Sequence, residues 1–229
     1  MQWKWIIMAA VGWGARIGLA VEWCFIPFHV SRNEPVGGCE LGRYEVTVEE
    51  FAAYLEEASI MDFPETAQIQ PMTGGRYRIK PGMASQAVSE VTFLEAEAFS
   101  TWLSGLEGRV IRLPTEREWV WAARGGVEDA PYPWGWGGQI ARLAQFNTKG
   151  PAQRVGRFPA NGFGLADMAG NVYEWCVPPP EGKADGFPAR GGAWSEWEPR
   201  RLHVENRQLF PPDYRGRDVG FRLLRESPE

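Results

Sequence analysis

Cysteine and histidine are the residues of this sequence that hold soft or borderline metal ions. The three cysteines, Cys24, Cys39 and Cys176, form no CxxC pair and have no zinc-site spacing. They are compatible with one disulfide and one remaining thiol, or with three buried thiols, and we favour the thiols. Only two histidines occur, His29 and His203, whereas an iron or zinc centre built on histidine needs two or three.

The composition indicates one folded domain. The 229 residues are 44% hydrophobic and 23% charged, which suffices for a single cored domain. The 27 glycines, 18 prolines and 12 tryptophans predict short elements and ordered loops held by large aromatic side chains. The net charge of −5 gives no electrostatic reason to expect nucleic acid as a partner.

The N-terminus has the features of an export or anchor segment. Lys4 precedes an apolar run from Trp5 to Ala15, long enough for a signal-peptide core but too short to span a membrane. Small residues near Ala20 offer a cleavage site. We therefore divide the chain into a signal-like or anchor segment, 1–21, and a folded domain, 22–229. The alternatives are a buried first strand and an uncleaved anchor with Arg16 at the interface.

Three helices are predicted by the same local device, a capping box in which Thr is followed three residues later by Glu. The boxes are Thr47–Glu50, Thr92–Glu95 and Thr115–Glu118, and each precedes apolar residues at helical spacing. Gly125 and Gly126 supply the positive-φ stop of the third helix.

The remainder reads as loops and short strands. Residues 66–82 have the character of a hairpin that turns at Gly74-Gly75. No long helix is predicted after Val127, and the apolar residues 218–224 are expected to form one closing strand. These features predict one α+β domain with a large irregular share.

Three segments of the chain resemble the formylglycine-generating enzyme (sulfatase-modifying factor) family, a variant of the C-type-lectin-like fold. They are "RLPTEREWVWAARGG" (112–126), "NGFGLADMAGNVYEW" (161–175), and "RGGAW" (190–194) with the closing "GFRLL" (220–224). The similarity covers roughly residues 22–225. It implies the fold more securely than the reaction, because one fold carries many functions.

In the family's copper-dependent oxidases, two cysteines bind copper(I) two and seven residues after the tryptophan of the third motif. Here these positions are Glu196 and Arg201, counted from Trp194. A carboxylate and a guanidinium do not replace two thiolates. We therefore expect no copper and no formylglycine-generating activity. Glu196 and Arg201 are predicted either to form an ion pair, with Arg200 or Glu205 competing, or to be separately solvated.

The resemblance also implies a calcium site in "LADMAGNVYEW" (165–175). Asp167 and Glu174 match the side-chain ligands, and Gly170 and Val172 match positions that offer backbone carbonyls. Such oxygens are the ligands that calcium prefers. The alternative is that Asp167 caps a turn and Glu174 pairs with an arginine. The family's other calcium loop is incomplete here, since the expected downstream aspartate is missing after Asn147 and Thr148.

Aromatic residues cluster around these motifs and either line a sugar or peptide groove or belong to the core, which we favour. They are Trp134, Trp136, Tyr173, Trp175, Trp194 and Trp197.

The function we expect is that of a non-catalytic interaction or scaffold module. Its specific form would be an extracytoplasmic accessory subunit, periplasmic or on the outer face of the cell membrane, that docks on a membrane-associated protein complex. Membrane contact would be made through residues 1–20. Two alternatives stay open: a pigment- or cofactor-maturation oxidoreductase that uses residues such as Glu196 or Tyr173, and a lectin-like carbohydrate or peptide receptor.

Overall fold

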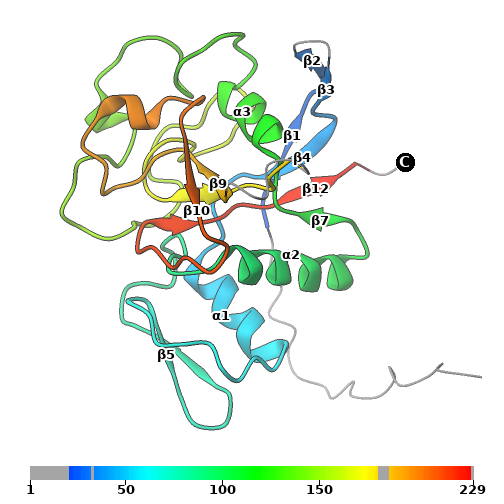
Figure 1. The fold of residues 1–229 in the computed structure, drawn as a ribbon, viewed down its shortest axis with the longest axis vertical. Coiled ribbons are helices and arrows are strands. Elements are labelled where there is room, and N and C mark those ends of the chain that lie inside the picture. Colours follow the sequence, from blue (N-terminus) through cyan, green and yellow to red (C-terminus); the bar gives the residue numbers. More distant parts are fainter. Residues whose placement is uncertain (1–20, 32–33, 180–185, 228–229) are drawn as a thin grey trace, which may run out of the picture.

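The computed structural model describes residues 21–31, 34–179 and 186–227 (Figure 1). The predicted signal-like or anchor segment, 1–21, falls almost wholly outside these residues. Two four-stranded sheets form the centre of the described part. Helices α1 and α2 lie on one side of them, and α3 lies on the opposite side (Figure 1). This is the α+β, C-type-lectin-like architecture expected from the sequence.

The three predicted capping boxes are confirmed, and each begins a helix. In every box the threonine hydroxyl accepts from the third amide, and the glutamate accepts from the threonine's own amide. The helices are α1 (Val48–Glu57), α2 (Phe93–Glu107) and α3 (Glu116–Arg124). Gly125, with φ of 60°, ends α3 as predicted.

The first sheet is antiparallel and has the order β1-β4-β12-β7. Its strands are β1 (Trp23–Ile26), β4 (Cys39–Gly42), β12 (Leu224–Glu226) and β7 (Ile111–Arg112). Strand β1 is an edge strand, and it runs toward the hairpin of β2 (His29–Ser31) and β3 (Glu34–Val36) at one corner of the molecule (Figure 1).

The second sheet has the order β10-β9-β8-β11, with β11 parallel to β8. Its strands are β10 (Arg207–Phe210), β9 (Phe187–Arg190), β8 (Tyr173–Trp175) and β11 (Val219–Gly220). The prediction of one strand over residues 218–224 is wrong. The chain passes from β11 in this sheet to β12 in the other, and the buried Arg222 lies at the crossing.

The hairpin predicted in residues 66–82 is confirmed. Strands β5 (Ile69–Pro71) and β6 (Tyr77–Ile79) pair antiparallel, and Gly74 and Gly75 both have positive φ in the turn. Beyond Val127 the helical elements of the described residues are short 3₁₀ turns, η1 (Ile140–Arg142) and η3 (Pro199–Leu202). The loops of residues 127–171 therefore form one side of the molecule (Figure 1).

Two hydrophobic clusters hold these layers together. The larger joins α1 and α2 to the sheets through a set of packed rings that includes Phe51, Phe99 and Phe221. The second surrounds the fully buried Trp119 of α3. Burial of such rings is the main stabilising contribution to a loop-rich fold. Among the described residues, no helix has the length and apolarity to cross a bilayer.

Candidate functional site

Arg222 and Glu174 form a buried ion pair between the two sheets. Glu174 belongs to β8, and Arg222 lies at the crossing between β11 and β12. The guanidinium Nε and Nη2 donate to the two carboxylate oxygens at 2.6 and 2.7 Å, and both side chains are at most 1% exposed. Two parallel charge-assisted bonds make this the geometry in which a buried pair best offsets its desolvation.

The remaining donors around this pair are also used. Trp119 Nε1 donates to Glu174 at 2.6 Å, so the central ring of the second cluster is tied to the same carboxylate. Arg222 donates further to the carbonyls of Gly42 and Ala166 at 2.9 and 3.0 Å. One arginine thereby connects both sheets and the loop that precedes β8.

Asp167, the other predicted side-chain ligand for calcium, caps a turn. Its carboxylate accepts from the amides of Gly156 and Phe158, and its backbone has a positive φ of 55°. Burial raises the pKa of Asp167, and the amide hydrogen bonds and the charge of Arg222 work against that rise. Asp167 therefore caps a turn and Glu174 pairs with an arginine, which is the arrangement predicted from the sequence as the alternative to calcium binding.

Glu45 is a third acidic residue in this region. The sequence motif of residues 165–175 does not include it, so the sequence alone did not identify it. It is 1% exposed, and its Oε1 accepts from the Asn171 side chain at 2.9 Å. Its Oε2 is buried without a hydrogen-bond partner among the described residues. Burial raises the pKa of Glu45 well above its ordinary value, and the charge of Asp167 adds to this effect.

The fit of a calcium ion can be judged from these charges. Three carboxylates, Glu45, Asp167 and Glu174, act on one guanidinium, so the cluster carries an excess of negative charge that a cation or a proton would neutralise. One observation argues against a calcium ion: both carboxylate oxygens of Glu174 already accept a hydrogen bond from Arg222. Within the described residues no group of three or more acidic, histidine or cysteine side chains is arranged to hold a metal. Calcium binding by Asp167, Gly170, Val172 and Glu174 stays a prediction.

The backbone at the predicted carbonyl ligands is closely packed. Gly170 has φ of 78°, and a Cβ there would lie 2.2 Å from the carbonyl oxygen of Gln145. Val172 is 1% exposed, in a small cluster with Ala87 and Ala152. Only glycine fits position 170, and the loop conformation is set by this contact.

The ion pair predicted between Glu196 and Arg201 is confirmed. Arg201 Nε lies 3.8 Å from Glu196 Oε2, and the Tyr173 hydroxyl donates to Glu196 Oε1 at 2.6 Å. Glu198 competes for Arg201 at 3.9 Å. Of the two competitors expected, Arg200 pairs with Glu198 instead and Glu205 pairs with Arg124. The two positions equated with copper ligands therefore carry opposite charges in contact.

Backbone bonds hold this pair in place. The amide of Asn147 donates to the carbonyl of Glu196 at 2.8 Å, and the amide of Thr148 donates to that of Trp194 at 3.0 Å. Burial raises the pKa of Tyr173 above its ordinary range, and the hydrogen bond to Glu196 raises it further. At neutral pH this hydroxyl is a proton donor and not a nucleophile.

The three cysteines lie away from this pair and are free thiols. Cys24 and Cys39 are on the neighbouring strands β1 and β4, and Cys176 follows β8. All three pack around Trp119 in the second cluster. Burial raises the pKa of Cys39 to about 12, and it also raises those of Cys24 and Cys176. These are structural thiols with little thiolate at neutral pH.

The six aromatic residues noted in the sequence divide into two groups. Tyr173 and Trp175 are buried core residues, as favoured, and Trp134 and Trp194 are partly buried. Trp136 and Trp197, in contrast, are 65% and 69% exposed. Exposure of so large an apolar ring is the observation that distinguishes a binding surface from a core.

Comparison with known proteins gives a family match over most of the chain. Residues 26–227 match the model described as "Sulfatase-modifying factor enzyme 1-like domain". The chain is 34% identical over 206 residues to the serine/threonine-protein kinase pkn1 of Chlamydia caviae, which covers 80% of this chain and 32% of that protein. It is also 35% identical over 153 residues to the inactive C-alpha-formylglycine-generating enzyme 2 of Mus musculus, a match that covers 59% of this chain and 47% of that protein.

Solved structures agree on the fold. The structure of PvdO from Pseudomonas aeruginosa has a TM-score of 0.66 and 28% identity, and covers 88% of this chain and 84% of that one. Treponema denticola variable protein 1 has a TM-score of 0.69 at 22% identity, and covers 91% and 92%. The chain spans about a quarter to a half of the length of the curated relatives it matches.

Proposed function

The chain belongs to the sulfatase-modifying factor enzyme 1-like family, and from this we propose that it is a non-catalytic interaction module of that family. Its specific role would be that of an extracytoplasmic accessory subunit that docks on a membrane-associated protein complex. Because the chain spans less than half of its curated relatives, their whole-protein activities are not carried over.

The observation that carries the proposal is the contact between Glu196 and Arg201. The positions equated with two copper-binding cysteines are occupied by an anion and a cation 3.8 Å apart, and Tyr173 closes the group at 2.6 Å. A guanidinium cannot coordinate copper(I), and it repels any cation brought beside it. The inactive relative in Mus musculus supports the view that the family includes members without the oxidase reaction.

An exposed apolar surface at the N-terminal corner supports docking. Phe25 on edge strand β1, Phe28, and Val30 on β2 are 61%, 65% and 56% exposed. We name these three residues the N-terminal apolar patch. They follow directly on the segment predicted to reach the membrane. Large apolar side chains grouped at an open sheet edge are typical of protein or membrane contact surfaces.

A copper and turnover experiment tests the non-catalytic part. The purified full chain, incubated with copper(I), should bind no stoichiometric copper. It should also consume no oxygen in the presence of a cysteine-containing peptide. The double variant Glu196→Cys/Arg201→Cys is the matched gain-of-site control for copper binding. Near-stoichiometric copper in the unmodified protein, or turnover of the peptide, would replace this proposal with the enzyme.

Localisation and docking are tested separately. A C-terminal reporter that is active only outside the cytoplasm should be active when fused to the full chain. The full chain should also co-purify from membranes with partners in stoichiometric amounts. The Phe25→Ser/Phe28→Ser variant should lose them, whereas Met61→Ser, an exposed apolar residue outside the patch, should not. A protein found only in the cytoplasm and without partners would refute this part.

A further inference from the structure

A shallow pocket lies on the loop side of the molecule, at the C-terminal end of α3. Its volume is about 430 Å³, and residues of the 133–136 loop, the end of α3 and the 160–162 segment line it. We name it the tryptophan pocket after Trp134 and Trp136. It shares no lining residue with the N-terminal apolar patch or with the Glu196–Arg201 pair.

The floor of this pocket is rigid. The Asn161 side-chain amide donates to the carbonyls of Ala122 and Ala123 at 2.7 and 3.0 Å and so caps the last turn of α3. Its oxygen accepts from the amides of Phe163 and Leu165. A Cβ at Gly162 would lie 2.2 Å from the carbonyl oxygen of Gly125, so the two backbones are in contact. A floor held in this way needs no ordering when a ligand binds.

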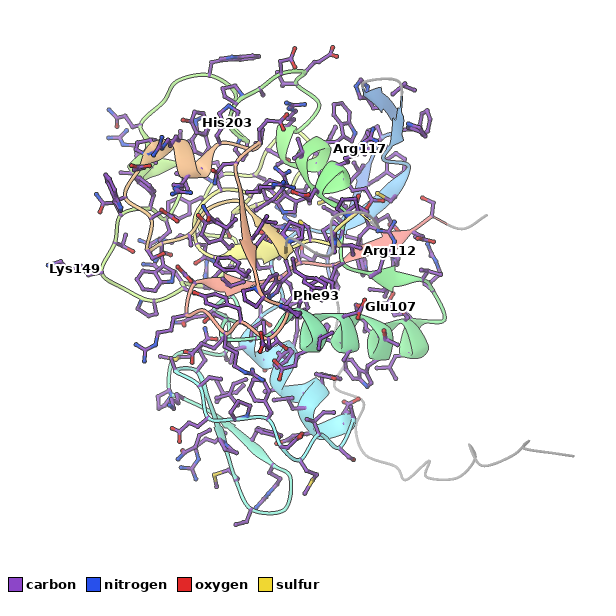
Figure 2. All side chains as sticks on the ribbon, viewed as in Figure 1. Phe93, Glu107, Arg112, Arg117, Lys149 and His203 are labelled. Atoms are coloured by element: carbon purple, nitrogen blue, oxygen red, sulfur yellow. The ribbon has the colours of Figure 1, made fainter. Side chains whose placement is uncertain are left out.

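The aromatic wall is fixed in part as well. Trp134 Nε1 donates to the carbonyl of Gly137 at 2.8 Å, and the Trp134 ring stacks on Tyr132 with centroids 5.0 Å apart and planes at 1°. Tyr132 in turn packs against His203 at 5.7 Å, and Figure 2 places His203 among the loops of this side. Trp136 is 65% exposed on the glycine-rich turn that follows. Trp134 is thus held by its neighbours, and Trp136 presents an open ring.

Arg124 is the charged residue of the lining, and an ion pair balances its charge. Arg124 Nη2 pairs with Glu205 at 2.6 Å, and the arginine side chain is 13% exposed. Its Nε is buried and has no hydrogen-bond partner among the described residues. The pocket therefore presents one guanidinium, whose charge is balanced by a carboxylate outside the lining, beside two aromatic rings.

These features select among ligand classes. A cationic ligand is disfavoured because Arg124 lines the pocket, and an anionic one because Glu205 already neutralises that arginine. A polyproline peptide needs indole N–H groups for its carbonyls, and of the two indoles in the lining that of Trp134 is occupied by Gly137, which leaves Trp136 alone to bind such a peptide. Single-stranded nucleic acid requires a basic groove, and the chain has a net charge of −5.

What fits is a neutral ligand with an apolar face and hydroxyl groups. We infer that the tryptophan pocket binds a hexopyranose unit of a neutral glycan. The C–H face of the sugar ring lies on the electron-rich face of Trp136, and its hydroxyls bond to the guanidinium of Arg124. This goes beyond the proposed function, since it assigns a glycan ligand to a site separate from the docking patch.

The test titrates the full chain with neutral hexaoses of glucose, mannose, galactose and N-acetylglucosamine, followed by tryptophan fluorescence and calorimetry. At least one should give a saturable signal. Trp136→Ala should weaken its binding by about tenfold or more, which is 1.4 kcal/mol, whereas Trp136→Tyr should keep most of it. Trp197→Ala, equally exposed but outside the pocket lining, is the matched control and should leave binding unchanged.

Three results would overturn the inference: no saturable binding of any hexaose, binding that survives Trp136→Ala, or saturable binding of decaproline instead of a glycan. Trp136 is on the surface, so its variants keep the fold, which their melting curves verify. The Phe25→Ser/Phe28→Ser variant should retain glycan binding. Failure of the glycan inference can therefore be distinguished from failure of the proposed docking function.

Discussion

At the residue scale, Arg222 is the fully buried charged side chain that joins the two sheets of the described fold. It donates to Glu174 and to three backbone carbonyls from two further segments: those of the adjacent Gly42 and Arg43, and that of Ala166. A charge in such a position is stable only while its partner is present. The same reasoning makes Gly170 essential, because its close contact with Gln145 sets the loop that leads into β8.

We predict that Arg222→Ala lowers the free energy of unfolding by about 3–5 kcal/mol, because it leaves Glu174 buried without its cation. Denaturant unfolding measures this change. Arg200→Ala is the control, since its ion pair with Glu198 is 77% exposed on the arginine side and is worth less than about 1 kcal/mol. If Arg222→Ala does not fold, Arg222→Met/Glu174→Gln should recover folding. Equal losses from Arg222→Ala and Arg200→Ala would contradict the prediction.

Gly170 and Gly82 allow a matched comparison, because both have φ of 78°. Gly82 has open space where a Cβ would be added, so Gly82→Ala should cost only the backbone strain of about 1–2 kcal/mol. Gly170→Ala adds a clash with the Gln145 carbonyl and should cost clearly more. The difference in unfolding free energy between the two variants isolates the clash. No difference would show that the 145 and 170 segments separate at little cost.

At the element scale, β7, α3 and β12 are linked by one network of charges. Arg112 of β7 donates to both carboxylate oxygens of Glu118, in the first turn of α3, at 2.9 and 2.8 Å, and to Glu226 of β12 at 2.8 Å. Arg112 is labelled in Figure 2, close to the side of α2 that carries Glu107. Glu118 also completes the capping box of α3, so the start of this helix and its place against the first sheet depend on one carboxylate.

This network predicts a pH dependence of stability. Burial alone would raise the pKa of Glu118, but the hydrogen bonds and charge of Arg112 outweigh it and lower that pKa. An acid with a lowered pKa stabilises the fold above its unfolded value of about 4.3, and this stabilisation is lost as the pH falls through the folded value.

Glu118→Gln should therefore reduce the free energy of unfolding at pH 7 by about 1.5–3 kcal/mol. It should also flatten the loss of stability below about pH 4.3. Unfolding measured from pH 7 to pH 3 tests both. Glu65→Gln is the control, since the Lys80–Glu65 pair is exposed. A Glu118→Gln curve parallel to that of the unmodified protein would contradict the assigned role.

At the scale of the whole molecule, the surfaces divide by side. The N-terminal apolar patch is carried by β1 and the start of the β2–β3 hairpin, which form one corner of the molecule in Figure 1. The tryptophan pocket is lined by the end of α3 and by the loops of residues 133–136 and 160–162. The charged Glu196–Arg201 pair is a third and separate region. The two surfaces proposed for binding are thus separate from each other and from this ion pair, as the proposed interaction role requires.

The predicted calcium ion would act on the stability of the whole domain. If Asp167, Glu174 and the carbonyls of Gly170 and Val172 bind it, excess EGTA should lower the melting temperature, because an ion that binds only the native state stabilises it. At one hundred times the Kd the loss is about 2.7 kcal/mol, or several degrees at roughly 2–4 °C for each kcal/mol. Added calcium should reverse it.

An unchanged melting curve in excess EGTA, together with no calcium in the purified protein by mass spectrometry, would end the calcium prediction. The excess negative charge of the Arg222 cluster would then be neutralised by a proton on Glu45. Glu45→Gln keeps the shape of that side chain without its charge. If calcium is bound, this variant should weaken its effect on melting; if a proton is present, the variant should melt as the unmodified protein does.

The amino-acid sequence alone determined the features that depend on neighbours close along the chain. The three capping boxes join residues three positions apart, and the turn at Gly74-Gly75 needs only local φ values, so their sequences predicted α1, α2, α3 and the β5–β6 hairpin. The Glu196–Arg201 pair, five residues apart, was foreseen as one of two outcomes. Contacts of this range close only short loops and so cost little loop-closure entropy, which lets the local sequence decide them.

Only the tertiary structure decided the rest. Residues 218–224 look like one apolar strand, yet they divide between two sheets because Arg222 must reach Glu174, 48 residues away, and Gly42, 180 residues away. Trp175 and Trp136 are equivalent by composition, but one is buried and the other is open to solvent. Burial and long-range pairing depend on how distant segments close around a common core, and no local pattern contains that information.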